Sequence, residues 1–528
     1  MEGKAVAILE VSQKQAFIFS SNKLKDNVAN SAIIAWITSS EYFEEVCSRE
    51  LFCKEKNLIY AGGGHTVLQF CNKDAAVDFV KKVTLQVKVD YPEVELFAKV
   101  LECGEEIKLH DLKELSKQLE VKKSERRAAF HQGSFGIEAV DSVTLNPEVV
   151  SINGKQKKKE MPEEEKKIER ELGPEGDYIP AGKFENLGGS REESNFIAVV
   201  HIDGNGMGKR VANLRESLEQ EEAEKGWGDV SGKLKEFSES IDQNFKDSYH
   251  DMVKDVQKRL ESDKLSDLNL KEHCFPVRRI ITAGDDICFV TEGRIGIECA
   301  NLFIKHLNTK ENSVDHKGYA ACAGVAIVHQ KYPFYRAYEL AEMLCGNAKS
   351  YIATTGDADS GQEVSAIDWH IEFGELEDTI DEIRKDYEAE DGSRMELRPY
   401  IVSAPESFYE KDPARDYRKF QKLMKAMMGE GISFARGKMK NLRAYMHQGI
   451  EQTQYYLDNS GIGELGLLGN VGIYEKADLE KMFSGSGQNR KCYEKASDGK
   501  QHSLFYDAIE LLDTYIALEE VGEETYED

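Results

Sequence analysis

The fold is decided by two stretches, 196-FIAVVHIDGNGMG-208 and 279-RIITAGDDICFV-290. In each, an apolar run typical of a β-strand delivers aspartate to a bend that contains glycine. Asp203 ends the first strand, and Asp285 and Asp286 lie at a Gly-Asp turn that suits a two-residue hairpin. Carboxylates that meet at one edge of a sheet are the ligands that two-metal phosphoryl or nucleotidyl transfer requires. The pattern therefore predicts a protein that handles nucleoside triphosphates.

The composition is that of a folded protein with several domains. The chain has 528 residues, 40% hydrophobic and 31% charged, and a net charge of −27, which argues against general nucleic-acid binding. No apolar run has the length of a membrane span, and the N-terminus lacks the apolar core of a signal peptide, so we expect no membrane association. The ten cysteines include no C-x-x-C pair, which indicates buried thiols in a reducing compartment, and we expect a cytoplasmic protein.

The order of elements around these stretches is duplicated in the chain. Each copy has a strand, a helical segment, a hairpin, a helix and a last strand, which predicts an α+β fold with two ferredoxin-like units. The first copy has its strands and second helix at Ala5–Val11, Leu58–Phe70, Asp74–Val83 and Val94–Leu101, and the second at Phe196–Asp203, Arg279–Val290, Ile295–Leu307 and Tyr319–Val328. In the helix of the second copy, Ile297, Ala300 and Ile304 fall at helical spacing, which predicts one buried face.

Four regions follow from this order. We expect a degenerate ferredoxin-like unit at residues 1–112, a charged helical linker region at 113–195, a complete unit at 196–393 with a helical insertion at about 214–275, and a helical C-terminal domain at 394–528. The mixed-charge run Lys155–Glu171 predicts a solvated linker or an exposed helix. Leu504–Leu518 has strong helical periodicity.

The two copies are not chemically equivalent. Where the second copy has Ala283-Gly284-Asp285-Asp286, the first has Gly62-Gly63-Gly64-His65, which contains no acid. The first strand offers only Glu10 near its end, and we expect His65 to be a surface or packing residue. The first copy thus keeps the shape and lacks the metal site.

Glycines and two lysines complete the candidate site. Glycines after Asp203 leave backbone N–H groups open at the start of a helix, where the helix dipole favours a phosphate, and Gly284 permits a positive φ and close approach of a nucleotide. Lys349 could reach the outer phosphates as a point charge. We expect the nucleotide to contact Gly204, Asn205, Gly206, Gly208, Lys209, Gly284 and Lys349. Each motif alone also occurs in ordinary turns or helix ends, so the prediction depends on their order along the chain.

In that order the motifs resemble the catalytic palm of the large polymerase/cyclase subunit of type III CRISPR effector complexes. They are Asp203–Gly208, Ala283–Asp286, Ala323–Ile327, Lys331–Phe334, Ala341-Glu342, Ala348-Lys349 and Ile367–Trp369. That palm is related to class III nucleotide cyclases and GGDEF diguanylate cyclases, and it converts ATP into cyclic oligoadenylates that switch on effector proteins in antiviral defence. The family also has two palms, of which the N-terminal one is degenerate.

The resemblance implies a role for each matching residue. Asp203 and Asp285 or Asp286 would be the catalytic ligands of a two-metal Mg²⁺ or Mn²⁺ site, Gly284 would line the nucleotide, and Lys349 would contact the triphosphate. The sequence departs from the family at Ala283, the first position of the usual GGDD motif. The family's nuclease domain and zinc-binding cysteines are also missing, and the dipeptides at His110 and His250 lie in helical, charged surroundings that indicate surface positions. We therefore expect a shortened, free-standing relative that works without a guide RNA.

The leading hypothesis is a metal-dependent nucleotidyltransferase that releases pyrophosphate and makes a short cyclic or linear oligonucleotide signal. Its partners would be nucleoside triphosphates, with ATP favoured by the resemblance alone, and an effector protein that responds to the product. The alternative is a catalytically inactive nucleotide-binding sensor or scaffold that controls a partner. A diguanylate cyclase is less favoured, because the Gly-Asp-Asp turn is not followed by Phe and no dimeric sensory module is attached.

Overall fold

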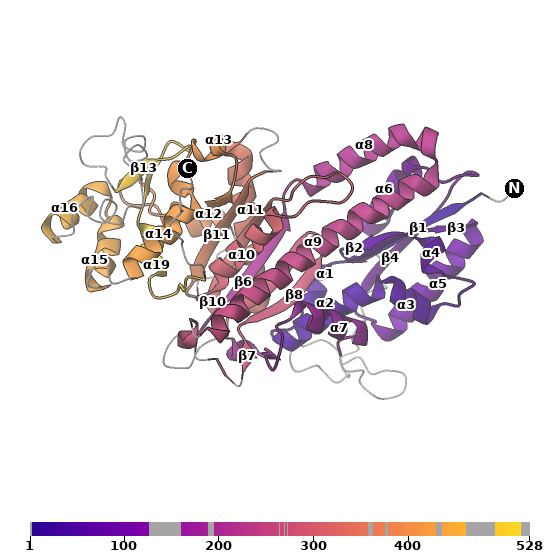
Figure 1. Cartoon of the computed structure of the whole chain (residues 1–528), viewed down its shortest axis with the longest axis horizontal. Helices are drawn as coiled ribbons and strands as arrows, with labels where there is room; N and C mark the ends of the chain where they lie inside the picture. Colours follow the sequence, from indigo (N-terminus) through magenta and orange to yellow (C-terminus); the bar gives the residue numbers. More distant parts are fainter. Residues whose placement is uncertain are drawn as a thin grey trace.

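The computed structural model describes residues 3–125, 160–187, 195–262, 264–268, 270–271, 273–356, 363–374, 379–428, 436–460 and 492–518. Two α+β units and a mainly helical C-terminal region follow one another along the longest axis (Figure 1). The long helix α9 (Trp227–Glu261) lies across the middle of the molecule.

The first unit (residues 5–124) is a four-stranded antiparallel sheet with helices on both faces. Its strands β1 (Ala5–Ser12), β2 (Leu58–Gly62), β3 (His65–Phe70) and β4 (Glu95–Glu102) have the order β2-β3-β1-β4. Its helices are α1 (Lys14–Ile18), α2 (Leu24–Ile37), α3 (Ser40–Val46), α4 (Lys54–Asn57), α5 (Lys73–Asp90) and α6 (Leu109–Ser124). Successive side chains of a strand point to opposite faces, so Ala7 and Leu9 join the main core while Val6 and Ile8 join a second core under α6.

The second unit (residues 196–403) has a six-stranded sheet around β6. Its strands β6 (Phe196–Gly204), β8 (Val277–Ala283), β9 (Asp286–Glu292), β10 (Ala321–His329), β11 (Ser365–Glu372) and β12 (Tyr400–Ser403) have the order β12-β11-β10-β6-β9-β8. Residues 197–202 of β6 are all buried because both faces of this central strand are covered. The parallel strands β10 and β11 are connected by α11 (Phe334–Thr355), as a parallel pair requires.

The predicted duplication is confirmed by strand order. The order β4-β1-β3-β2 in the first unit repeats as β10-β6-β9-β8 in the second, with β11 and β12 added beyond β10. Both units therefore have the ferredoxin-like arrangement, and the α+β fold class is confirmed.

A helical hairpin of the second unit holds the first unit. It consists of α8 (Met207–Lys225) and α9, and it supplies Leu218, Val230 and Leu234 to the core under α6. The Glu222 carboxylate accepts a hydrogen bond of 2.8 Å from the backbone N–H of Leu109, at the start of α6. Trp227 Nε1 donates to Gln69 Oε1 at 2.7 Å. The predicted insertion therefore braces the two units against each other.

The mixed-charge run differs from its prediction where the structure describes it. Helix α7 (Glu163–Leu172) packs against the second unit instead of lying free in solvent. Glu165 and Glu169 are one helical turn apart, so both face β8, where Glu169 pairs with Arg278 and Glu165 lies 3.8 Å from Arg279. Residues 155–159 of the run lie outside the described residues. Short elements follow at β5 (Ile179–Pro180), η2 (Phe184–Asn186), η3 (Ser266–Leu268) and β7 (Cys274–Phe275).

In its described residues the C-terminal region is mainly helical, as predicted, but it also contains short strands. Besides β12, it contains the hairpin β13 (Tyr493–Lys495) and β14 (Gln501–Ser503), and the periodic segment Leu504–Leu518 forms only the short helix α19 (Tyr506–Leu511). The other helices described in this region and in the segment before it are α12 (Ile380–Lys385), α13 (Glu406–Tyr409), η5 (Pro413–Arg415), α14 (Tyr417–Met428), α15 (Arg436–Met446) and α16 (Ile450–Ser460).

Helix α10 (Gly296–Asn308) is buried beyond the single face that we predicted. The C-terminal region covers its other side, where the fully buried Glu298 accepts hydrogen bonds from the hydroxyl groups of Tyr417 and Tyr515. A carboxylate with such donors satisfies its hydrogen-bonding needs away from water. Helical spacing did not reveal this contact, because Glu298 is a polar residue.

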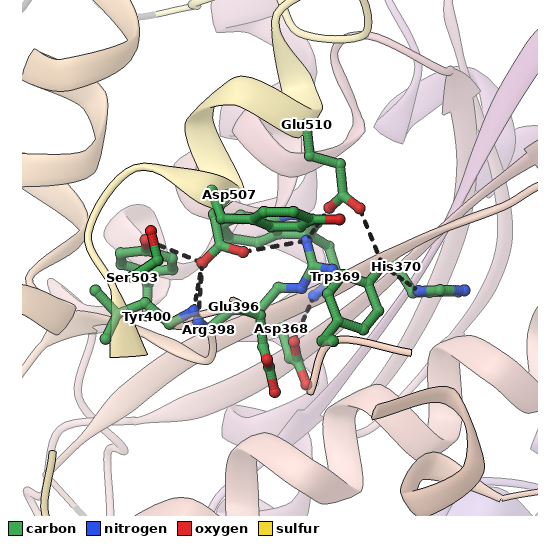
Figure 2. Close-up of polar contacts among 12 residues, drawn as sticks. Asp368, Trp369, His370, Glu396, Arg398, Tyr400, Ser503, Asp507 and Glu510 are labelled. Carbon is green, nitrogen blue, oxygen red and sulfur yellow. Dashed lines mark hydrogen bonds and ion pairs between the residues drawn. The ribbon is translucent and has the colours of Figure 1, made fainter. Parts of the chain in front are cut away.

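A buried ion-pair network fixes α19 to the sheet (Figure 2). Arg398 pairs with Glu510, and its guanidinium lies 3.5 Å from Asp507 and 5.5 Å from the centre of the Trp369 ring on β11. Asp507 Oδ2 also accepts hydrogen bonds from the backbone N–H of Arg398 at 3.0 Å and from the hydroxyl of Tyr400 at 3.1 Å. These ion pairs and hydrogen bonds offset part of the cost of burying the charges, although Nε and Nη2 of Arg398 make no hydrogen bond.

Candidate active site

Asp203 and Asp286 lie directly opposite each other on neighbouring strands. They are cross-strand partners in the antiparallel β6–β9 register, and the backbone N–H of Gly204 donates to the carbonyl of Asp285 at 3.2 Å. Opposite residues of an antiparallel pair place their side chains on the same face of the sheet. Two residues that are far apart in the sequence are thereby brought together at neighbouring strand ends, as we predicted.

The turn between β8 and β9 has the geometry of a two-residue hairpin. Gly284 has φ +66°, whereas Asp285 has a negative φ, and this combination requires glycine at the first turn position. The backbone N–H of Gly284 donates to Asp242 Oδ1 of α9 at 3.3 Å. The helix of the insertion therefore supports the turn that carries Asp285.

Lys349 of α11 contacts the first strand end. Its ammonium lies 2.5 Å from Asp203 Oδ2 and donates to the carbonyl of Gly204 at 3.3 Å. Burial alone would lower the pKa of Lys349, but the neighbouring Asp203 carboxylate more than offsets this and raises it. In this structure Lys349 supplies the positive charge that Asp203 needs.

The other two carboxylates lack such a partner among the described residues. Burial and repulsion by Asp203 raise the pKa of Asp285 to about 6 and that of Asp286 to about 7. Asp286 Oδ1 is buried and makes no hydrogen bond, and it lies 3.5 Å from Nδ1 of the buried His201. Burial lowers the pKa of His201, which favours a neutral ring. The site thus holds concentrated negative charge that the protein neutralises only in part.

A cleft of about 1030 Å³ opens beside Asp285 and Asp286, between the two units. It is lined from both sides, by residues that include Glu10, Lys14, Gly63, Gly64, His65 and Lys123 of the first unit and Asp242, Arg279, Ala283, Asp285 and Asp286 of the second. Asp203 and Lys349 are not part of its lining. His65, which we expected at the surface or in packing, contacts the Tyr60 ring and faces this cleft.

The loop after Asp203 has two sides. Gly206, which has φ +67°, is the N-cap residue of α8. Because glycine has no side chain, no side-chain oxygen at this position caps the first N–H groups of the helix. Gly208 and Lys209 are exposed, and none of these three residues lines the cleft. Asn205 points into the protein, where its amide nitrogen donates to the carbonyl of Val364 at 2.9 Å. A Cβ on Gly204 would lie 3.0 Å from Cβ of Asp285, so glycine permits the close approach of the two strand ends.

The donor chemistry of the site suits a hard divalent cation. Carboxylate oxygens of Asp203, Asp285 and Asp286 and the carbonyl of Gly204 are the oxygen ligands that Mg²⁺ prefers, and the buried Asp286 Oδ1 has no partner. Among the residues that the structure describes, however, no three His, Cys, Asp or Glu side chains form a group that could hold a metal ion. The ion pair with Lys349 holds Asp203 in this arrangement.

Three residues of the site were not predicted from the sequence. Asp242 lies in the middle of a charged helix, and no spacing links it to the Gly284 turn. His201 precedes Asp203 by two residues and so shares its face of β6, a relation that strand periodicity could have revealed. Lys14 belongs to the other copy of the fold, so only the packing of the two units brings it to the cleft.

Comparison with known proteins supports this architecture. Residues 196–354 match the family model described as Cas10/Cmr2, second palm domain. The chain resembles the Cas10-type large subunit of type III CRISPR complexes. No curated protein matches the sequence at a significant level.

Solved structures of Csm1, a Cas10-type subunit, share the fold over almost the whole chain. Csm1 of T. onnurineus superposes with a TM-score of 0.54 at 13% identity, covering 97% of this chain and 70% of that one. The Csm1–Csm4 cassette in complex with cA4 gives a TM-score of 0.53 at 13% identity, with 98% and 70% covered. The cassette in complex with one ATP gives 0.53 at 14% identity, with 97% and 70% covered. At these identities the similarity shows a common fold.

The cysteines match the expectation of buried thiols. All ten cysteines, which lie within the described residues, are free, and eight of them are buried. No helix in the described ranges combines the length and the apolar character that crossing a bilayer needs.

Proposed function

We propose that this protein is a metal-dependent nucleotidyltransferase that joins nucleoside triphosphates into a short cyclic or linear oligonucleotide and releases pyrophosphate. The observation that carries the proposal is the in-register pair Asp203–Asp286, with Asp285 in the adjoining turn. Asp285 and Asp286 line a cleft of about 1030 Å³. A cleft of this size at the top of the range for small-molecule sites can accommodate nucleotides.

Asp203, Asp285 and Asp286 would hold the Mg²⁺ or Mn²⁺ ions. Bound there, such ions would activate the attacking hydroxyl and neutralise charge on the triphosphate. Asp203 and Asp286 are cross-strand partners of β6 and β9, and α9 supports the turn through Asp242. The Lys349 ammonium would leave Asp203 and bind a substrate phosphate, since a lysine ammonium binds phosphate as a point charge.

The similarity to Csm1 supports a substrate and a role. Csm1–Csm4 structures hold ATP, cA3 and cA4, which are a nucleotide and two cyclic oligonucleotides. By this likeness ATP is the proposed substrate, and the product would act as a second messenger on an effector protein in antiviral defence.

One observation favours a second candidate, a catalytically inactive nucleotide sensor that controls a partner. The 2.5 Å ion pair between Lys349 and Asp203 occupies a carboxylate that metal binding requires. If that ion pair persists with nucleotide bound, the protein would bind a triphosphate in the cleft without catalysing nucleotidyl transfer.

Pyrophosphate release from each of the four NTPs, with Mg²⁺ or Mn²⁺ and with EDTA, tests the proposal. We expect release with metal only, and a phosphodiester product visible by mass spectrometry. Asp285→Asn combined with Asp286→Asn should reduce the rate by at least about 10²-fold, because both substitutions keep the side-chain shape and remove the charge.

The matched control is Glu216→Gln combined with Glu219→Gln, which removes two exposed carboxylates of α8 that do not line the cleft. The control should keep the wild-type rate. Equal rates in the two double variants would exclude the proposed site, and nucleotide binding without any product from wild type would select the sensor.

A further inference from the structure

Lys14 stands out among the basic residues that line the cleft. Five of the six pair with a carboxylate, and the pairs are Lys54–Glu41, Lys123–Glu10, Lys235–Glu239, Lys246–Asp242 and Arg279–Glu165. Within the described part of the chain, no carboxylate lies within ion-pair distance of Lys14. Its ammonium instead donates to the backbone carbonyl of Gly63. A partly buried cation without a counter-ion is costly unless an anion joins it.

The side chain of Lys14 is held on the glycine turn of the first unit. Its stem lies over Gly64, where an added Cβ would be 3.0 Å from Lys14 Cε. Gly63 and Gly64 have φ +58° and +77°, so this turn needs glycine at both positions. Burial lowers the pKa of Lys14, partly offset by the nearby carboxylates of Glu10 and Asp286. Lys14 lines the same cleft as Asp285 and Asp286 of the second unit.

Contacts between the units fix the position of Lys14 relative to the active site. Gln15, the next residue, donates to the Tyr338 hydroxyl at 3.2 Å and to Glu342 Oε1 at 3.0 Å, both on α11. The Asn22 side chain accepts a hydrogen bond of 2.7 Å from the backbone N–H of Phe334, at the start of the same helix. Since α11 carries Lys349, the two lysines are attached to one packed assembly.

The acid of the first unit that lies nearest the metal-site position is Glu10, and it is already paired with a lysine. In the β1–β3 register Glu10 and His65 occupy the places that Asp203 and Asp286 occupy in β6–β9. Glu10 is neutralised by Lys123 at 2.8 Å. This half of the cleft therefore offers an unneutralised cation where the second unit offers carboxylates.

We propose that Lys14 binds a phosphate group of the nucleotide in the cleft, as a substrate-positioning residue that the first unit contributes to the active site of the second. The proposal rests on the nucleotide-binding function proposed above. The ligand class is a nucleoside polyphosphate, whose charge would draw the ammonium from the Gly63 carbonyl.

The test is calorimetric titration of the full chain with α,β-methylene-ATP in Mg²⁺, with adenosine as the probe that lacks phosphate. Lys14→Met, which keeps the stem and removes the charge, should weaken binding of the analogue by about 10- to 100-fold, as loss of a charge-assisted hydrogen bond does. Its affinity for adenosine should not change. Lys14→Arg should restore most of the affinity for the analogue, which separates loss of the cation from misfolding.

The matched control is Lys25→Met, which removes an exposed lysine of the first unit outside the cleft lining. It should bind both probes like wild type. If Lys14→Met and Lys25→Met bind the analogue equally, or if Lys14→Met weakens adenosine binding to the same extent, the role of Lys14 is refuted while the proposed function stands. If wild type does not bind the analogue, both are refuted.

Discussion

Substituting Gly324 by alanine should disturb the active site through helix α11, which packs against β10. Gly324 lies on β10 where α11 crosses it, and an added Cβ would be 1.9 Å from the carbonyl oxygen of Ala341, 2.5 Å from the backbone nitrogen of Cys345 and 2.9 Å from Cβ of Leu344. Two of these neighbours are backbone atoms of the helix. They cannot rotate away as a side chain would, so α11 must shift as a body.

The size of the effect follows from this geometry. Overpacking a buried position costs about 1–3 kcal/mol, and a clash with backbone belongs at the upper end of that range. A loss of about 3 kcal/mol should lower the Tm by about 6–12 °C in a folding unit of some 150–250 residues. Because α11 carries Lys349, the same shift should move its ammonium away from Asp203 and reduce nucleotide turnover.

The assay is thermal unfolding with pyrophosphate release measured below the transition. Gly346→Ala is the control, since it lies on the same helix and an added Cβ would meet no atom within 4 Å. Alanine is the better helix former, so this variant should gain about 0.5–1 kcal/mol. A Gly324→Ala protein as stable as Gly346→Ala would refute the contact between β10 and α11 that we describe.

Two further predictions concern the C-terminal region. Glu494 is buried, its Oε2 makes no hydrogen bond, and burial together with Asp412 raises its pKa to about 7. The stability that its protonated form contributes is complete below about pH 4.5 and is lost as the pH rises through 7. Glu494→Gln should therefore raise the apparent free energy of unfolding by up to about 3 kcal/mol at pH 8 and by little at pH 4.5. A gain independent of pH would contradict this origin. Arg398→Met should cost about 3–5 kcal/mol in urea denaturation because it strands the buried Glu510 and Asp507, and Arg398→Met combined with Glu510→Met should cost less. A double variant as unstable as the sum of its two single variants would show that the pair is not coupled.

Much of the fold could be predicted from hydrophobic patterns. Strands such as β6 and β10 are continuous apolar runs bounded by glycine or polar residues, and their repetition revealed the duplication. The patterns failed where tertiary contacts override them. Helix α7 has the charge pattern of a solvated helix, yet its acids meet two arginines, and the periodic segment after Leu504 ends its helix at Leu511.

The site could be predicted only as far as local sequence determines it. The position of Asp203 opposite Asp286 follows from two strands that each end in a glycine bend. The ion pair between Lys349 and Asp203 depends on how α11 packs across β10 and β6. The spacing of residues in the sequence does not reveal this packing. Lys14 comes from the first unit, whose turn has no aspartate, and it reaches the cleft only because the two units pack against each other.

The brace formed by α8 and α9 limits how the two halves of the chain can be recombined. Leu218, Val230 and Leu234 are encoded with the second half but close the hydrophobic interior of the first. A fragment that stops near residue 125 would leave Val6 and Ile8 only partly covered, so we expect it to aggregate when expressed alone. Replacing either half by that of a homologue would disturb the packing of this shared core. We therefore expect a substitution on the first-unit side of the core to be accompanied by a compensating substitution in α8 or α9.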